Sequence, residues 1–300
     1  MAVETIFDRA ALRRRRARAA AGFAAHDFLF RAGAERLADR LDDLARPLPV
    51  ALELGAHGAI LGEAIAGRGG IATLIAADQA FALAAAARAP RLVADEEWLP
   101  FAPASLDLVL SNLSLHWVND LPGALAQIRA ALRPDGLLLA SLLGGRTLAE
   151  LRECLIAAEA EITGGARPRV SPFVELRDAG ALLQRAGFAL PVADADLLTV
   201  TWPDALALMR DLRGMGESNA LVGRARGFTR RDVLLRAAAL YAERFVEPGG
   251  RVRASFEIVT LTAWSPADSQ PRPLRPGSAA ARLADALGTA ERSAGEKAGG

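Results

Sequence analysis

The sequence predicts an α/β fold in which helices cover both faces of a mostly parallel sheet. Between residues 50 and 162, short apolar segments alternate with segments of helical composition. The apolar segments are continuous and do not alternate with polar residues, which is typical of parallel strands buried on both faces. Acidic or polar residues follow successive strand candidates, at the edge where open α/β sheets bind their ligands.

Ahead of this region, residues 8–45 are rich in Ala, Arg and Leu, with apolar residues at helical spacing. They predict about two amphipathic helices, ended by Pro47 and Pro49. Strands are then expected at 50–54, 71–76, 91–94, 106–110 and 136–141, and helices at 59–66, 80–87, 121–132 and 147–162. The run Leu132-Arg133-Pro134-Asp135-Gly136 is expected to end one helix and turn into the next strand.

The later part of the chain changes character. A helix is expected at 174–186, a strand at 192–201, a helical block at about 203–245 and a strand at 255–264. The block is therefore predicted to be an insertion before the last strand, beside the ligand pocket as a lid or substrate platform. The expected division is a helical segment over 1–46, a main domain over 47–266 and a flexible tail over 267–300, with a short helix at 279–287 as an alternative.

Composition excludes several classes of function. Lys and Arg number 36 against 35 Asp and Glu, and the net charge of +1 gives no overall reason to expect nucleic acid or a membrane as partner. Cys154 stands alone, which excludes an internal disulfide framework and suits the cytoplasm. His26, His57 and His116 are widely spaced and predict no metal site. No apolar run is long enough to suggest a membrane span.

Arginines cluster near the start of the chain. Arg9, Arg13 and Arg16 would share one helix face, whereas the others point elsewhere, namely Arg14, Arg15 and Arg18. Because the charge surrounds the helix, a solvated helix is predicted in place of a nucleic-acid or membrane surface.

The strongest local motif runs from Val50 to Gly58, a buried strand that enters a small-residue turn before a helix. Gly55 allows the backbone to approach a ligand, although turn geometry alone also explains a glycine here. Asp78, after the second strand, could accept hydrogen bonds from ribose hydroxyls or cap a helix. Asp95, after the third, could accept from an adenine amine or lie in a solvated acidic loop.

The fourth strand leads into a second polar segment. Ser111 and Asn112 would present polar groups at the crevice, and His116 with Trp117 could wall the ligand. The alternative is a satisfied core histidine and a packing tryptophan. Polar signals at four successive strand ends converge where a ligand of an open α/β sheet would lie.

These motifs resemble those of class I S-adenosylmethionine-dependent methyltransferases. Longer runs narrow the resemblance to the respiratory complex I assembly factors that act as protein arginine hydroxylases, namely Ile6-Phe7-Asp8-Arg9, Leu113 to Pro122, Ser171-Pro172-Phe173, Arg185 to Phe188 and Gly214 to Asn219. The resemblance implies a Rossmann-like fold with a seven-stranded sheet. It also implies S-adenosyl-L-methionine as cofactor and an arginine of a complex I subunit as substrate, with the protein near the inner membrane only through that partner.

The resemblance also assigns roles to residues. Glu53 and Gly55, with Ala56 and His57 in the same turn, would frame the methionine part of the cofactor. Asp78 would hold its ribose, Asp95 and Glu96 would lie at its adenine, and Ser111 and Asn112 would complete the crevice. The candidates for contact with the substrate are Glu217, Asn219, His116 and Trp117, of which Glu217 suits a guanidinium because a carboxylate accepts a bidentate fork.

One motif departs from the family. Family members carry Gly-x-Gly-x-Gly, whereas this chain has Gly55-Ala56-His57-Gly58-Ala59, which predicts weakened or lost cofactor affinity. Two other functions therefore stay open. One is a methyltransferase acting on a small molecule or carrier-bound acid, as in the malonyl-carrier group, and the other is a non-catalytic assembly module.

Overall fold

The computed structural model describes residues 4–88, 90–271 and 283–290. The chain forms two units, 1–267 and 268–300. In the second, the described residues include the short helix α10 (Leu283–Leu287), within the alternative helix at 279–287. Most of the segment predicted to be a flexible tail lies outside the described residues.

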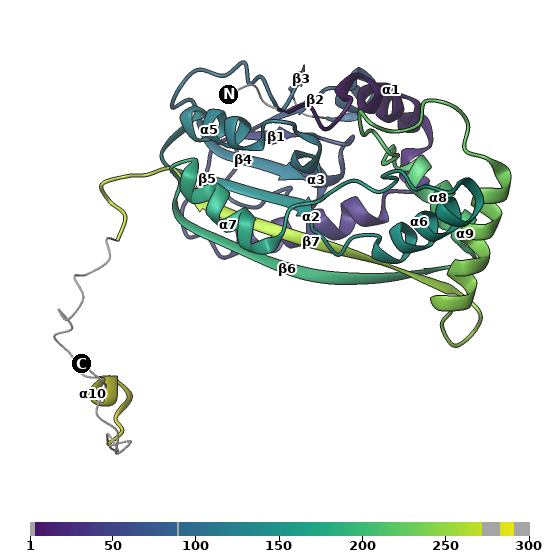
Figure 1. Cartoon of the computed structure of the whole chain (residues 1–300). Helices are drawn as coiled ribbons and strands as arrows, with labels where there is room; N and C mark the ends of the chain where they lie inside the picture. The colour runs from purple at the N-terminus through teal and green to yellow at the C-terminus, as the bar shows by residue number, and fades with distance from the viewer. Residues whose placement is uncertain (1–3, 89, 272–282, 291–300) are drawn as a thin grey trace. The chain divides into compact units, whose positions relative to one another are not determined.

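The first unit is built on a seven-stranded sheet with the order β3-β2-β1-β4-β5-β7-β6 (Figure 1). The strands are β1 (Val50–Leu54), β2 (Thr73–Asp78), β3 (Arg91–Val93), β4 (Leu106–Asn112), β5 (Leu132–Leu143), β6 (Ala189–Trp202) and β7 (Val252–Trp264). β7 runs antiparallel to both of its neighbours, and the pairs from β3 to β5 are parallel. This confirms the predicted mostly parallel, seven-stranded sheet.

Alternate residues of the central strands enter two separate cores. On β4, Leu108 and Leu110 pack with the apolar residues of one core, whereas Val109 packs with those of the other. Both groups are fully buried. The sheet is therefore covered on both faces, which is why its strands read as continuous apolar runs.

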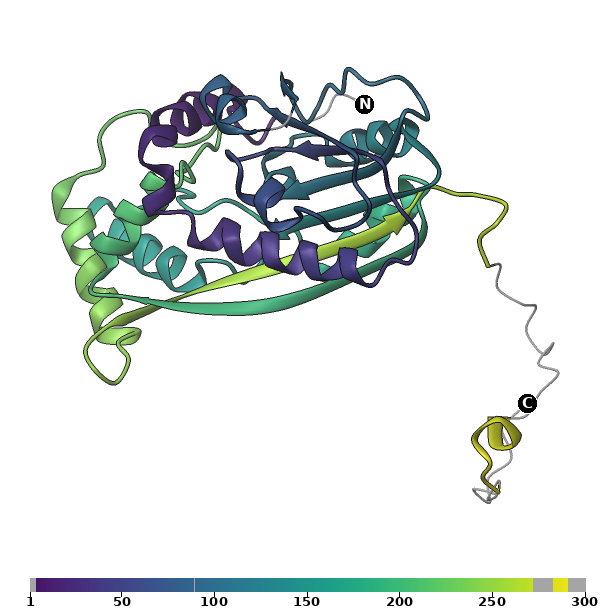
Figure 2. The same cartoon turned by 180° about the vertical axis from the view of Figure 1, so that it is seen from behind.

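Helices form the two layers that cover the sheet (Figures 1 and 2). α5 (Leu121–Ala131) and α7 (Leu176–Arg185) pack on one face. α2 (Phe28–Asp42) and α3 (Ile60–Ala64) pack on the other, together with α6 (Ala149–Thr163), α8 (Ala205–Gly214) and α9 (Arg231–Arg244). α4 (Phe81–Ala86) connects β2 and β3. Because α8 and α9 lie between β6 and β7 in the chain, they form the helical block expected before the last strand.

The segment 132–136 differs from its prediction. β5 already begins at Leu132, directly after α5, and no separate turn precedes the strand. Asp135 adopts φ +65°, and the register with β4 shifts between Leu106 and Leu108. The strand thus absorbs the turn-forming residues as an irregularity.

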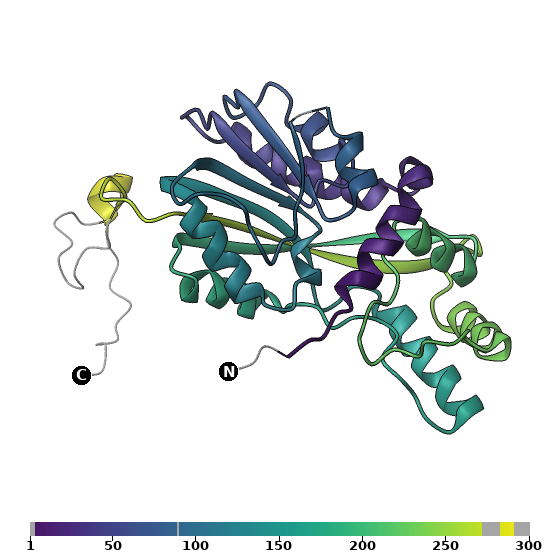
Figure 3. The same cartoon turned by 90° about the horizontal axis from the view of Figure 1, so that it is seen from above.

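The N-terminal segment is part of the first unit. It comprises α1 (Arg9–Ala19), a 3₁₀ helix (Ala20–Ala25) and α2, whose Phe30 and Leu37 are fully buried. α1 lies at the end of the sheet where β1, β2 and β4 terminate (Figure 3). No helix among the described residues is long and apolar enough to cross a membrane.

The prediction that α1 is simply a solvated helix is wrong for two of its arginines. Arg16 is completely buried and the side chain of Arg9 is 12% exposed, whereas Arg13 and Arg14 are exposed. Both buried arginines find carboxylates at the end of the sheet, and this offsets the cost of removing their charges from water.

Candidate functional site

Two buried carboxylates stand at neighbouring strand ends. Glu53 lies on β1 and Asp78 ends β2, and both side chains are about 1% exposed. Burial, with the charge of Asp78 beside it, raises the pKa of Glu53 well above its ordinary range. Oε1 of Glu53 has no hydrogen-bond partner among the described residues. A buried acceptor without a donor is unusual and marks a place for a ligand's donor.

The turn after β1 approaches other chain segments closely. Gly55 adopts φ +77°, and a Cβ there would lie 2.3 Å from the side chain of Ser114. Ala56 is buried, and His57 follows at φ +45° with its N–H donating to Asp78 at 3.2 Å. Only glycine tolerates the conformation and the contact at position 55 without strain.

The His57 ring packs below this turn. Its centroid is 4.4 Å from that of Phe30, and it stacks on Phe23 at 6.2 Å. Neither ring nitrogen has a hydrogen bond to a described residue, and burial lowers the pKa of His57 well below its ordinary range. The imidazole that replaces a family glycine therefore behaves as a neutral core side chain under the N-terminal helices.

The loop after β3 binds the N-terminal helix. Arg9 donates to Asp95 at 2.5 Å and also to Glu96, a pair of contacts that fixes the start of α1. Glu96 also accepts from Ser114 at 2.5 Å. Burial alone would raise the pKa of Glu96, but Arg9 and Arg16 outweigh it and hold this pKa below the ordinary value.

Arg16 lies among the carboxylates of Asp78, Glu96 and Glu217. We call these carboxylates, together with Glu53 and the turn at Gly55, the acidic crevice. The guanidinium of Arg16 donates to Ser114 at 3.2 Å and lies 3.6 Å from Glu96 and 3.6 Å from Glu217. Nε and Nη2 have no hydrogen bonds within the described part of the chain. Arg16 thus neutralises the crevice electrostatically without satisfying its own hydrogen-bonding capacity.

Ser111 and Asn112 are engaged inside the fold. The Ser111 hydroxyl donates to the carbonyl of Leu54 at 2.8 Å, and the Asn112 amide donates to the carbonyl of Phe30 at 2.8 Å. Ser141 donates to Asn112 at 2.9 Å. In this state their side chains tie strands and α2 together and do not face an open crevice, so their role at the cofactor stays a prediction.

A second cluster lies around Glu217. Its carboxylate accepts from Trp117 Nε1 at 2.6 Å and lies 3.5 Å from Nε2 of His116. Burial would raise its pKa, but His116 and Arg16 outweigh this and hold the pKa of Glu217 below the ordinary value. Oε1 has no hydrogen bond in the described structure and lies 3.6 Å from Nη2 of Arg16.

Asn219 lies on the same segment but bonds to the chain. Its amide donates to the carbonyl of Pro168 at 3.1 Å and its oxygen accepts from Leu221 N–H. Gly216, at φ +81°, lets this segment meet α1, because a Cβ there would lie 3.2 Å from the Cα of Arg16. The structure thus brings Glu217, His116 and Trp117 together, with Asn219 at their margin.

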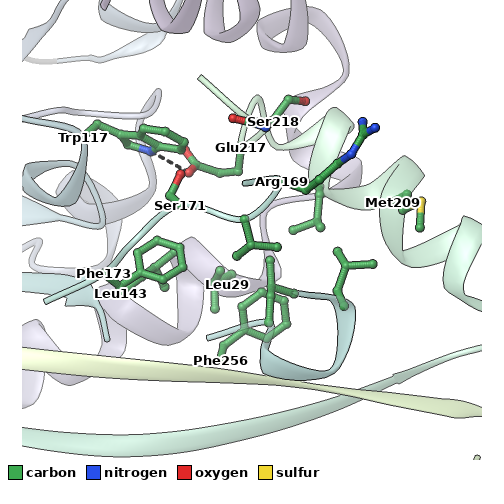
Figure 4. Close-up of a pocket in the computed structure, with 15 residues that line it drawn as sticks. Leu29, Trp117, Leu143, Arg169, Ser171, Phe173, Met209, Glu217, Ser218 and Phe256 are labelled. Atoms are coloured by element: carbon green, nitrogen blue, oxygen red, sulfur yellow. Dashed lines mark hydrogen bonds between the residues drawn. The ribbon is translucent and has the colours of Figure 1, made fainter. Parts of the chain in front are cut away.

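An apolar cavity of about 740 Å³ opens beside Glu217 (Figure 4). Figure 4 shows Trp117 and Glu217 at one end, opposite Phe173 and Phe256. The remaining lining is mostly aliphatic and comes from α2, α6, α8 and the loops after β5 and α6. One buried carboxylate on an apolar wall suits a ligand with a long aliphatic stem and a cationic end.

Among the described residues, no group of His, Cys, Asp or Glu is arranged to hold a metal ion. Cys154 is buried, and burial raises the pKa of its thiol to about 11. The chemistry-bearing groups of the first unit are therefore the carboxylates and arginines of the crevice and of the Glu217 cluster.

Known proteins resemble this chain in sequence and in fold. The methyltransferase-domain family matches residues 52–140. The mitochondrial arginine hydroxylase NDUFAF5 of Danio rerio is 40% identical over 287 residues, which cover 93% of this chain and 89% of the relative. The chain belongs to the methyltransferase superfamily.

Other superfamily members extend the comparison. Human NDUFAF5 is 41% identical over 267 residues, covering 84% of this chain and 74% of the relative. A malonyl-[acyl-carrier protein] O-methyltransferase of Xylella fastidiosa is 38% identical over 270 residues, covering 87% of this chain and 89% of the relative. The solved YcgJ protein of Bacillus subtilis shares the fold, with a TM-score of 0.53 at 13% identity over 77% of this chain and 98% of its own.

The cofactor of this methyltransferase superfamily is S-adenosyl-L-methionine, as the sequence predicts. The crevice residues fit it, because orphaned buried atoms gather at the strand ends, with Glu53 Oε1 as an acceptor and a glycine turn where a Cβ would intrude. Buried carboxylates also suit its sulfonium and ammonium charges. Arg16 lies among these residues, 3.6 Å from Glu96 and 3.6 Å from Glu217.

Sequence reasoning missed Arg9, Arg16 and Ser114 as parts of the site. The signal for the first two was present, since both lie on the helix face that the arginine spacing defined. Their partners are 80 or more positions away in the chain, however, and no local pattern links them.

We expect the native chain to gain stability relative to an Asp78→Asn variant as the pH falls. Burial raises the pKa of Asp78 from 3.8 to about 6. The folded chain therefore binds a proton where the unfolded chain does not, and this contribution is lost as the pH rises through the folded value. For one such carboxyl the gain from pH 7 to pH 5 is about 1 kcal/mol. Urea unfolding at both pH values measures it, and parallel changes in the two proteins would contradict it.

Proposed function

We propose that this enzyme binds S-adenosyl-L-methionine in the acidic crevice and modifies an arginine of a respiratory complex I subunit during assembly. The observation that carries the proposal is the buried Glu217 carboxylate at the end of an apolar cavity, with its pKa held below the ordinary value and its Oε1 making no hydrogen bond to a described residue. An arginine side chain has the matching form, an aliphatic stem that ends in a planar guanidinium.

Different residues of the crevice would bind different parts of the cofactor. Glu53 would accept from its ammonium group, Gly55, Ala56 and His57 would frame the methionine part, and Asp78 would accept from the ribose hydroxyls. Asp95 and Glu96 would lie at the adenine once Arg9 releases them, and Ser111 and Asn112 would support the strand end beneath. When bound, the cofactor supplies a sulfonium methyl group and a positive charge to the crevice.

The Glu217 cluster would orient the substrate. The indole N–H of Trp117 holds Oε2 of Glu217, and Oε1, which lies 3.6 Å from Arg16 Nη2, would accept from the incoming guanidinium. His116 adds a second polar neighbour and Asn219 lies at the cavity rim. Burial of the Glu217 carboxylate with the substrate guanidinium would exclude water, which strengthens the attraction between their charges.

Hydroxylation is the reaction that we propose, because the relatives named arginine hydroxylase cover most of the chain. Conversion of a C–H bond to C–OH takes one oxygen atom from dioxygen, and the other leaves as water with two electrons from a reductant. We further propose that the protein acts in the cytoplasm, at the inner membrane only through its complex I partner.

The test is incubation of the full-length protein with S-adenosyl-L-methionine, dioxygen, a reductant and complex I subunits, followed by mapping of modified residues by mass spectrometry. An added oxygen on an arginine is the expected product. An unmodified set of subunits, with cofactor binding intact in calorimetry, would refute the assignment and favour a non-catalytic assembly module.

A second candidate is methyl transfer to a carrier-bound acid. The specific observation in its favour is the identity of 38% to a malonyl-[acyl-carrier protein] O-methyltransferase across 89% of that relative. The apolar cavity would then hold an acyl chain. The same mass spectra separate the two candidates, because an added methylene and an added oxygen differ in mass.

A further inference from the structure

A basic cleft of about 590 Å³ adjoins the apolar cavity. Arginines from three parts of the chain line it: Arg15 of α1, Arg167 and Arg169 of the loop after α6, and Arg224 of the loop after α8. We refer to these four residues as the arginine cleft. The cleft and the cavity share Arg169 and the pair Ser218-Asn219, next to Glu217. A chain segment that leaves the cavity by this side must therefore pass the arginines.

The positive charge of the cleft is only partly neutralised. Arg169 pairs with Glu159 at 2.6 Å, and Arg224 pairs with Asp8 at 2.8 Å. The guanidinium groups of Arg15 and Arg167 form no ion pair within 4.0 Å in the described part of the chain, although the backbone N–H of Arg167 donates to Glu159 at 3.0 Å. Two guanidinium charges therefore remain without an acidic partner.

Arg15 is held in place although it has no carboxylate. It donates to the backbone carbonyls of Ser218, at 3.0 Å, and Asn219. Burial and the positive charges of Arg224 and Arg18 lower its pKa. The local potential is therefore positive at the segment that carries Glu217.

This potential bears on substrate selection. A substrate arginine that reaches Glu217 must approach the two guanidinium charges that have no acidic partner, which repel it unless its own segment carries negative charge. The planar guanidinium of an arginine, in turn, donates two parallel hydrogen bonds to a carboxylate. The cleft thus disfavours a basic segment and favours an acidic one.

We propose that the arginine cleft binds a carboxylate side chain of the protein segment that carries the modified arginine. The proposal deepens the proposed function and rests on it. Because the cleft and the cavity share residues, and an extended chain advances about 3.3–3.6 Å per residue, the carboxylate lies within about four residues of the arginine. The structure thereby assigns a sequence preference to the substrate, an arginine flanked by Asp or Glu.

Two nine-residue peptides of alanine with a central arginine test this preference. One carries glutamate and the other glutamine at the positions three before and three after the arginine. With full-length protein and S-adenosyl-L-methionine, fluorescence anisotropy is expected to give about three- to tenfold tighter binding of the glutamate peptide, as two exposed ion pairs would. The difference is expected to shrink as salt is added.

The variant Arg15→Gln/Arg167→Gln is expected to remove the preference for the glutamate peptide. The matched control is Arg13→Gln/Arg177→Gln, which makes the same charge change at two exposed arginines outside the cleft and is expected to keep the preference. Equal affinities for the two peptides, including no measurable binding of either, overturn the proposal, as would equal losses in both double variants. A cleft built for the phosphate of a carrier would also give equal affinities.

Mass spectrometry of the same mixtures, after addition of dioxygen and a reductant, separates this proposal from the proposed function. A preference for the glutamate peptide without any added oxygen would leave the cleft in place and refute arginine hydroxylation. An oxygen added to both peptides, bound equally well, would refute the cleft and leave hydroxylation in place.

Discussion

An Arg16→Gln variant is expected to bind S-adenosyl-L-methionine about tenfold more tightly than the native chain, which corresponds to about 1.4 kcal/mol. The guanidinium of Arg16 lies between Glu96 and Glu217, in the crevice that the cofactor has to enter. Binding must therefore displace it and separate its charge from two carboxylates. The variant no longer has this contact to break, and its crevice lacks a positive charge that the sulfonium can supply.

The same substitution is expected to destabilise the cofactor-free protein. Arg16 is fully buried, and removal of one partner from a buried ion pair leaves a charge without compensation, at a cost of about 3–5 kcal/mol. Urea unfolding measures this loss, and calorimetry measures cofactor affinity. The cofactor should also raise the melting temperature of the variant more than that of the native chain, because it restores the missing charge.

Arg13→Gln is the matched control, since Arg13 is an exposed arginine of the same helix. It should leave both affinity and stability near native values, and Arg16→Lys, which keeps the charge, should fall between. Loss of cofactor binding in Arg16→Gln alone would show that this arginine holds the cofactor, and the idea that it obstructs the crevice would be wrong.

The contrast between the sheet and α1 shows what a sequence can predict here. Each central strand can be predicted from its own residues, because a strand buried on both faces must be apolar throughout, as Leu108, Val109 and Leu110 are. The strand ends followed from the same reasoning, and with them the positions of Glu53 and Asp78. These features depend on neighbours in the chain, so local pattern was sufficient.

The arginines of α1 depend on distant partners. Their spacing placed Arg9 and Arg16 on one face, but nothing nearby indicates that Glu96 and Glu217 lie opposite that face. When Glu96 and Glu217 are not known to lie nearby, a solvated helix is the expected structure for a segment with this many arginines. Ser111 illustrates the reverse case, because its hydroxyl follows the expected polar pattern and yet donates to the carbonyl of Leu54.

A Glu217→Gln variant is expected to bind an arginine peptide at least ~30-fold more weakly. A buried pair of charged, hydrogen-bonded groups contributes about 2–5 kcal/mol to recognition, and ~30-fold is the lower end of that range. Glutamine keeps the acceptor for the indole of Trp117. The fold of the cluster is therefore preserved while the charge that would meet the guanidinium is removed.

Peptide affinity by anisotropy, with the extent of modification by mass spectrometry, measures the effect. Glu153→Gln is the matched control, because Glu153 is an exposed glutamate of α6 that pairs with Arg244 outside the cavity. Unchanged peptide binding in Glu217→Gln would show that the substrate guanidinium does not bind at Glu217. If the natural substrate were a carrier-bound acid, the same substitution should instead tighten its binding, because a negative charge facing the acyl chain would be gone. The sign of one affinity change thus separates the two substrate classes.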